Sequence, residues 1–318
     1  GDIHDWNRVQ SMLNRLEILR DGSPDDRQIA ASLATALSNF MVDFSQDGQC
    51  DHDDAWRWFD HVFHRLDALY DSFSDPKNVE IAVASARPSC NTLEDAYWPG
   101  GFVRLESMMK RLDKLRHDFP ENDEIAAAMA NTVVNALKQA YAKSHFEIVD
   151  DMIGRLNEVY DQSSNNFEVA MAMADAAFVI SIHHCDADAW IKVDAMLDRL
   201  EGLRANFDEN STIASFIAVS ASNIIMCSYD VNHGPVFSKA WDLLVEVRQM
   251  FSKNVEIGSC AAQSAAYIAL EAQKVGNWPH VEVMVAHLLE ICDAFPENEE
   301  ILSIAADVCE DIGVEVVP

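Results

Sequence analysis

Residues 193–210 read VDAMLDRLEGLRANFDEN, and residues 105–122 show the same pattern as LESMMKRLDKLRHDFPEN. In each stretch, apolar residues recur at intervals of three and four, and a Phe then leads into an acidic turn that ends in Asn. This spacing places the apolar side chains on one face of an α-helix, which must be buried against another element. The recurrence indicates an internal repeat, and the period of that repeat decides the fold.

An anchor leucine marks this repeat along the whole chain. Its last four steps are each 44 residues, and its first two are 50 and 46 residues, which indicates insertions in the first two repeats. Such a period holds two helices of about 18 residues each once the turns are subtracted. The anchors are Leu16, Leu66, Leu112, Leu156, Leu200, Leu244 and Leu288.

These observations predict an all-α chain of seven antiparallel helix pairs. Neither helix of a pair can bury its apolar stripe alone, so successive pairs should stack into an elongated α-solenoid. No linker or low-complexity stretch divides the chain, which favours a single helical-repeat domain. The predicted repeats span residues 5–50, 51–101, 102–144, 145–189, 190–234, 235–277 and 278–318.

The turn between the two helices of a repeat closes on an asparagine. Its side-chain oxygen can accept hydrogen bonds from the unpaired amides of the next helix, so we predict an N-cap here. In the second repeat, Asp75 followed by Pro76 is predicted to take this role. The five asparagines are Asn122, Asn166, Asn210, Asn254 and Asn298.

The second helix of each repeat is rich in alanine, as in residues 125–130, IAAAMA. Small side chains allow close approach to neighbours, so we expect these helices to form the more enclosed of two layers. Pro88 falls within the second helix of repeat two. It should kink or end that helix, because proline has no amide donor.

Gly276-Asn277-Trp278 introduces one repeat, and Phe-Pro-Glu-Asn turns begin at Phe119 and Phe295. This pattern resembles the tetratricopeptide family, whose units also turn through Gly-Asn or Gly-Asp and end near a Pro. The chain departs from the family in its period of 44 residues, against about 34, and in lacking a Trp-x-x-Leu-Gly signature. The resemblance implies a lengthened, right-handed superhelix that binds a partner through its concave face.

Charge restricts the possible partners. Against 53 Asp and Glu the chain has only 23 Lys and Arg, which gives a net charge of −30. A field of this sign repels phosphate backbones and anionic membrane surfaces, so we predict no nucleic acid and no membrane partner. A basic or amphipathic protein or peptide is the expected partner, although the charge could equally serve solubility alone.

Seven cysteines are scattered through the chain, and no two form a CxxC pair. Their odd number and spacing predict reduced thiols and a cytoplasmic location. We also interpret the sequence as having no apolar run that approaches the length of a membrane span, and no signal-peptide pattern.

Residues 183–186, His-His-Cys-Asp, are the densest cluster of potential metal ligands. Adjacent helical residues point about 100° apart, so His183 and His184 are poorly placed to share one ion. We interpret the cluster as a helix C-terminus, where histidine favours the helix dipole. No phosphate loop or nucleophile motif is present, and we predict a non-catalytic protein with no metal and no cofactor.

Residues 51–54, Asp-His-Asp-Asp, leave an alternative open. Acidic motifs bind Mg²⁺ in some all-helical enzymes, so a terpenoid-synthase-like enzyme is the second interpretation. Such enzymes need a second metal-binding motif, and we identify none in this sequence. The favoured interpretation is a loop in which Asp53 or Asp54 caps a helix starting near Trp56. A regulatory or sensor module cut from a larger protein is the third.

An arginine precedes the anchor leucine in each of the first five repeats. Such a ladder could capture an anionic ligand, but in so acidic a chain we expect internal pairing with carboxylates, as Arg111 could achieve. The ladder consists of Arg15, Arg65, Arg111, Arg155 and Arg199.

The candidate site is a polar row on the second helices, at positions 19, 23 and 27 after the anchor. Asparagine there can pair with an extended peptide backbone as donor and acceptor, while Asp and Glu supply complementary charge. The alternative is that these side chains satisfy neighbouring helices within the fold. The polar row consists of Asn39, Asp43, Asn131, Asn135, Gln139, Asp175, His183, Asn223, Gln263, Tyr267 and Glu271.

Overall fold

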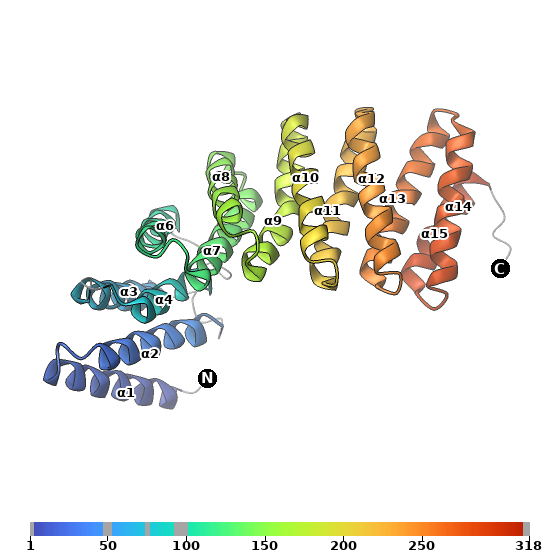
Figure 1. The fold of residues 1–318 in the computed structure, drawn as a ribbon. Coiled ribbons are helices and arrows are strands. Elements are labelled where there is room, and N and C mark those ends of the chain that lie inside the picture. The colour runs from blue at the N-terminus through green and yellow to red at the C-terminus, as the bar shows by residue number, and fades with distance from the viewer. Residues whose placement is uncertain (1–2, 47–52, 74–76, 92–100, 314–318) are drawn as a thin grey trace. The chain divides into compact units, whose positions relative to one another are not determined.

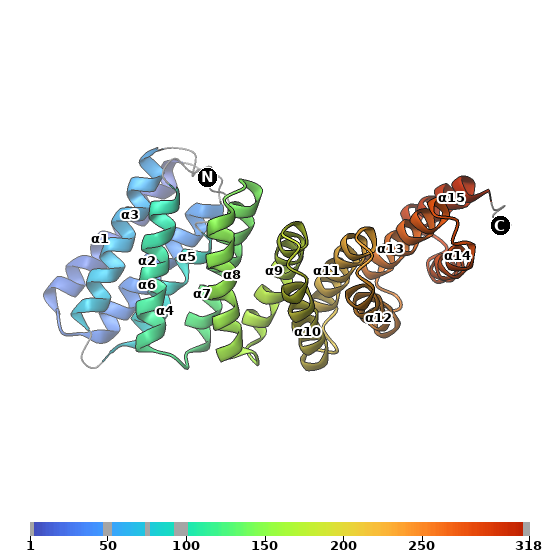
Figure 2. The ribbon, with the colours of Figure 1, turned by 90° about the horizontal axis from the view of Figure 1, so that it is seen from above.

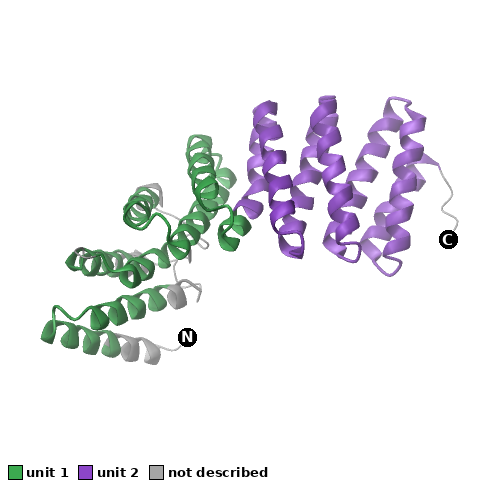
Figure 3. Ribbon diagram, viewed as in Figure 1, with its two compact units in different colours: residues 1–172 green, residues 173–318 purple. Residues whose placement is uncertain are grey.

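A computed structural model of the protein describes residues 3–46, 53–73, 77–91 and 101–313. Within these ranges the chain forms fifteen helices and no strand, so the predicted all-α class is confirmed (Figure 1). The chain divides into two compact units, residues 1–172 and 173–318 (Figure 3). The division falls inside helix α9 (Phe167–Asp186).

In the first unit, consecutive helices pack against one another. Helix α2 contacts α1, α3 and α4, and helix α7 contacts α4, α6 and α8, so the alanine-rich helices also pack on one another. The helices of this unit are α1 (Ile3–Gly22), α2 (Arg27–Gln46), α3 (Asp53–Ser72), α4 (Val79–Ala86), α5 (Pro88–Asn91), α6 (Gly101–Asp118), α7 (Asp123–Ala142) and α8 (Phe146–Ser163).

The second unit has two layers of helices. Helix α13 contacts α11 and α15 within one layer, and it contacts α12 and α14 of the other layer, as Figure 2 shows. The helices after α9 are α10 (Trp190–Asn206), α11 (Ser211–Asp230), α12 (Gly234–Met250), α13 (Val255–Lys274), α14 (Trp278–Ala294) and α15 (Glu299–Ile312).

The helices follow the period of the sequence. Helices α8, α10, α12 and α14 begin at residues 146, 190, 234 and 278, in steps of 44 residues. The anchors Leu156, Leu200 and Leu288 have no exposed surface, and Leu244 is 1% exposed. The apolar stripe read from the sequence is therefore the buried face of each first helix.

All five predicted asparagine caps are confirmed. Each side-chain Oδ1 accepts a hydrogen bond from the backbone amide three residues later, at N···O distances between 2.9 and 3.2 Å. The prediction for repeat two is wrong, because α4 begins at Val79 and its cap is Asn78. Asp75 and Pro76 themselves lie outside the described residues.

Pro88 breaks the second helix of repeat two, as predicted. Helix α4 ends at Ala86 and the short helix α5 begins at Pro88, with Arg87 between them in a turn. The missing proline amide leaves one backbone hydrogen bond unmade, so one long helix becomes two pieces.

A left-handed residue ends the second helix of four successive repeats. Ser144, Asp188, Asn232 and Gly276 have φ of 60°, 52°, 56° and 75° and lie 44 residues apart. The amide of the following residue donates to a carbonyl five residues earlier, as His233 does to Ser228 at 2.8 Å. This is the Schellman arrangement, which reverses the chain into the next helix.

The caps should contribute measurably to stability. Asn210→Ala removes the acceptor of the Ile213 amide and should lower the free energy of unfolding by about 1 kcal/mol. Urea denaturation followed by circular dichroism measures this. The control is Asn206→Ala, an exposed asparagine at the end of α10, and an equal loss in both variants would contradict a capping role.

The left-handed turns give two substitutions of opposite sign. Gly276→Ala should destabilise by about 1 kcal/mol, because an alanine at positive φ is strained although nothing lies within 4 Å of its added carbon. Ser144→Gly should stabilise by up to about 1 kcal/mol at the equivalent turn, because the same strain is removed. Thermal melts of both variants check this, and melting temperatures that move in the same direction would refute it.

Candidate functional site

The polar row lies on the second helices of both units, and each unit is described by itself. In the first unit, Asn39 on α2 is exposed, and Asn131, Asn135 and Gln139 on α7 are half-buried. The side chain of Asp43 lies outside the described part of α2. The α7 members are thus neither in the core nor fully in solvent, which fits the exposed edge of a packed layer.

In the second unit the row is uneven. Asp175 and Asn223 are half-buried and Gln263 is exposed, but His183 is buried, with 8% of its surface exposed. The Asn223 amide donates to the Val219 carbonyl of its own helix at 2.7 Å. Part of the row is therefore satisfied locally, while its last member on α13, Glu271, lines a cavity.

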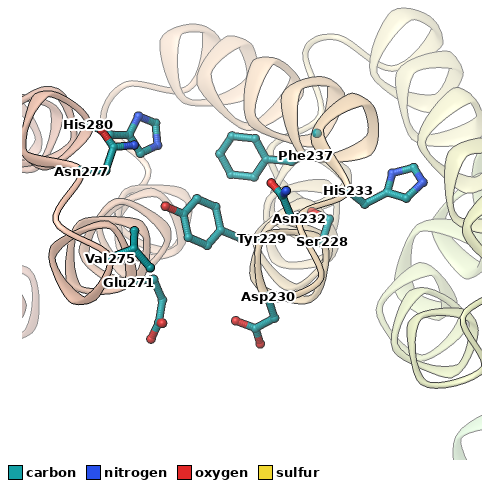
Figure 4. Close-up of a pocket in the computed structure, with 11 residues that line it drawn as sticks. Ser228, Tyr229, Asp230, Asn232, His233, Phe237, Glu271, Val275, Asn277 and His280 are labelled. Atoms are coloured by element: carbon teal, nitrogen blue, oxygen red, sulfur yellow. The ribbon is translucent and has the colours of Figure 1, made fainter.

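That cavity has a volume of about 600 Å³ and lies wholly within the second unit (Figure 4). It forms where α11 and α13 end and where the left-handed turns at Asn232 and Gly276 lead into α12 and α14. It is lined by Ser228, Tyr229, Asp230, Asn232, His233, Gly234, Phe237, Glu271, Val275, Asn277 and His280.

Aromatic rings surround Tyr229 in this cavity. The Tyr229 ring lies 5.4 Å from that of Phe237 and 6.2 Å from the nearly parallel ring of His280, measured between centroids. Tyr267 makes an edge contact with it at 6.5 Å. Burial raises the pKa of the Tyr229 phenol, and the negative charge of Glu271 adds to this, so the hydroxyl stays protonated at neutral pH.

Two carboxylates border the same rings. Asp230 accepts a hydrogen bond from the Tyr267 hydroxyl, and Glu271 is paired with Lys274 one turn along α13. In the view of Figure 4, the carboxylates of Asp230 and Glu271 extend to one side of the Tyr229 ring. The pKa of Tyr267 is raised by its burial and then by its bond to Asp230. The cavity thus combines aromatic faces with negative charge.

Of the row predicted from the sequence, Glu271 lines the cavity and Tyr267 contacts the ring of Tyr229, but the aromatic lining itself was not predicted. Tyr229 lies in the last turn of the second helix α11, two residues beyond the spacing that defined the row, and Phe237 and His280 lie on the first helices α12 and α14. Their signal in the sequence is an aromatic residue on each side of one second-to-first-helix turn. His233, also at this turn, points away and stacks on Trp190 with ring centroids 5.0 Å apart.

Three ladder arginines of the first unit, Arg65, Arg111 and Arg155, pair with carboxylates of the protein, as predicted. Arg111 makes a two-pronged contact with Asp67, at 2.6 and 2.8 Å, and its guanidinium lies 4.0 Å from the centroid of the Phe63 ring. Arg155 contacts Asp113 at 2.9 Å, and Arg65 contacts Glu17. Each carboxylate directly follows the anchor of the preceding repeat, so the ladder joins neighbouring helix pairs.

The described residues do not form a metal-binding geometry at either alternative site. No group of three potential ligands gathers anywhere in the part of the chain that the structure describes. His183 and His184 are buried in the last turn of α9, as the prediction of a helix C-terminus requires. Asp51 and His52 lie outside the described residues, and α3 begins at Asp53, so the predicted capping of a helix near Trp56 is wrong.

The statement that no apolar run approaches a membrane span also needs correction. Among the described residues, α9 and α11 are each 20 residues long, with mean hydropathies of 1.2 and 1.5. By length and composition, both are long and apolar enough to cross a membrane. Of these apolar windows, 67% and 61% are buried within the protein, as in core helices. Glu168 and Asp175 interrupt the apolar residues of α9, and serines and Asn223 interrupt those of α11, so neither helix forms an unbroken apolar run in the sequence.

The described cysteine side chains form no disulfide. Cys185, Cys227, Cys260, Cys292 and Cys309 are free thiols, three of them buried, which fits cysteine used as a small apolar side chain.

The sequence matches no protein-family model, and no curated protein is significantly similar to it.

The ladder predicts a stability difference between buried and exposed pairs. Arg111→Ala should lower the free energy of unfolding by about 1–2 kcal/mol, because it loses the pair with Asp67 and the packing on Phe63. Lys110→Ala, beside it, removes only an exposed pair with Glu106 and should cost below about 0.5 kcal/mol. Chemical denaturation of the two variants decides the matter, and equal effects would count against a structural ladder.

Proposed function

We propose that this protein is a non-catalytic scaffold that binds a basic or amphipathic segment of another protein. In this proposal, seven antiparallel helix pairs stack as a right-handed, tetratricopeptide-like superhelix, and the polar row lines its concave face. The regular helix starts, the buried anchors and the repeated turns support this arrangement. Fold alone does not define function, which is carried by the chemistry of the site.

One observation carries the proposal: the polar row of α13 ends in a cavity that pairs aromatic rings with carboxylates. Aromatic side chains contribute large contact areas in protein interfaces, and carboxylates add attraction for cations. Tyr229 and Phe237 supply the first property, and Asp230 and Glu271 the second. A segment with positive and apolar side chains complements both.

The charge of the whole chain supports the same partner. Cations of the ladder are held in internal pairs, as with Arg111 and Arg155, so they do little to attract anions from solution. The net charge of −30 then acts on approaching molecules and speeds the encounter with cationic ones.

Binding should therefore depend on salt and on the sign of the peptide. A fluorescein-labelled peptide of alternating Lys, Arg and Leu should bind the full chain, with an affinity that falls about tenfold between 50 and 300 mM NaCl through screening. The control is a peptide of the same length in which Glu replaces the cations. Fluorescence anisotropy measures both, and preferential binding of the acidic peptide would overturn the proposal.

The polar row is tested by truncating its asparagines. Asn135→Ala and Asn223→Ala should each weaken the basic peptide at least about tenfold, with nearly unchanged melting temperature, because the amides pair with peptide backbone. Asn206→Ala, an exposed asparagine outside the row, serves as the control. A lower melting temperature with unchanged affinity per folded molecule would show instead that the row satisfies the fold.

A further inference from the structure

We propose that the cavity around Tyr229 binds the guanidinium of an arginine side chain in the partner segment. This inference deepens the proposed function and rests on it, since it names the chemistry that one part of the site selects.

The lining of the cavity favours a cation. The electron-rich faces of Tyr229 and Phe237 attract positive charge, and both rings are half-buried, which lowers the competition from water. Two carboxylates, from the end of α11 and the last turns of α13, border the same space. No arginine or lysine is among the residues that line it. An anion would meet like charge here, and a neutral side chain would leave the carboxylates without a new partner.

The arrangement favours arginine over lysine. A guanidinium is planar, so it can stack on an aromatic ring while its five N–H donors reach carboxylates in the plane. Asp230 and Glu271 lie on different helices, so a fork of donors can engage both, whereas an ammonium acts as a point charge. The exposed Asn232 and Asn277 at the turns can pair with the backbone that flanks the arginine.

The carboxylates remain open to a ligand although each has a partner in the protein. The Tyr267 hydroxyl uses one acceptor position of Asp230, and a carboxylate has about four such positions. Lys274 contacts Glu271 from an exposed side chain, 66% of whose surface is open to solvent. Such a pair contributes little and is readily exchanged. Lys274 is therefore an internal competitor that a bound arginine displaces.

The combination occurs at this turn and not at its neighbours in the repeat. The residue 44 positions before Tyr229 is Cys185, and the residue 44 positions after it is Gln273. The residue 44 positions before Glu271 is Cys227. Single members do recur, since Asp186 lies 44 positions before Asp230 and Tyr141 lies 88 positions before Tyr229. The combination of tyrosine, aspartate and glutamate does not recur at these turns, as expected of a site and not of a packing requirement.

The test uses the full chain labelled with 3-fluorotyrosine, which gives six ¹⁹F positions because the sequence has six tyrosines. Tyr229→Phe and Tyr267→Phe assign the two resonances at the cavity. The probe is the blocked peptide Gly-Ser-Arg-Ser-Gly, compared with versions that carry lysine or citrulline in place of arginine. Citrulline has nearly the shape of arginine without its charge. We expect the arginine peptide to shift the Tyr229 resonance in a saturable way, the lysine peptide to bind at least about threefold more weakly, and the citrulline peptide not to shift it.

Two matched pairs of variants separate the cavity from the general field. Glu271→Gln should weaken the arginine peptide about fivefold to tenfold, while Glu297→Gln, with the same charge change in the α14–α15 turn, should alter its affinity less than about twofold. Lys274→Gln should strengthen binding about twofold to threefold, and Lys253→Gln, an exposed lysine in the α12–α13 turn, should change it less.

The outcomes are distinct. Saturable arginine binding that Glu271→Gln weakens selectively supports the cavity assignment. A Tyr229 resonance that does not respond to the arginine peptide overturns it, as do equal effects of Glu271→Gln and Glu297→Gln. If the long basic peptide still binds in those cases, the cavity assignment fails and the scaffold proposal stands. If that peptide also fails to bind, the proposed function fails with it.

Discussion

The burial of one apolar stripe per helix is the constraint on which the rest of the structure depends. A single amphipathic helix leaves its stripe in water, so each helix must pack on another, and the anchors Leu156, Leu200 and Leu288 show no exposed surface as a result. Because the stripe recurs with the same spacing, the same packing can recur as well. The alanine-rich helices permit close approach in the second layer, and this explains why α13 contacts both α11 and α15 directly.

Polar interactions set the geometry that apolar burial leaves open. Asparagine caps fix where the second helices begin, and left-handed residues such as Asn232 fix where the chain turns back. Ion pairs such as Arg111 with Asp67 then join one helix pair to the preceding one. These groups have directional bonds, so they define helix ends and neighbours more sharply than hydrophobic contact can.

The internal pairing of arginines connects the fold with the proposed function. An acidic chain that uses its arginines inside its own framework presents mainly carboxylates to solvent. At most turns these carboxylates are solvated, but beside Tyr229 they meet aromatic rings in a hollow of about 600 Å³. A cation bound there contacts aromatic faces and carboxylates at the same time. A few precisely placed polar groups in a largely apolar pocket are the usual source of selectivity in small binding sites.

The helical class, the 44-residue period, the five asparagine caps, the break at Pro88 and the internal pairing of Arg111 follow from local spacing and short-range chemistry, so all of them could be predicted from the sequence. The sequence placed Glu271 and Tyr267 in the candidate site for the same reason. The N-cap of α4 was predicted at Asp75 but is Asn78. The left-handed conformation of Asp188 was not predicted, because an aspartate does not require a positive φ. Only the tertiary structure decided that Tyr229, Phe237, Glu271 and His280 share one cavity. These residues lie in different helices and turns, and the packing between helices that brings them together depends on summed contacts that no local pattern records.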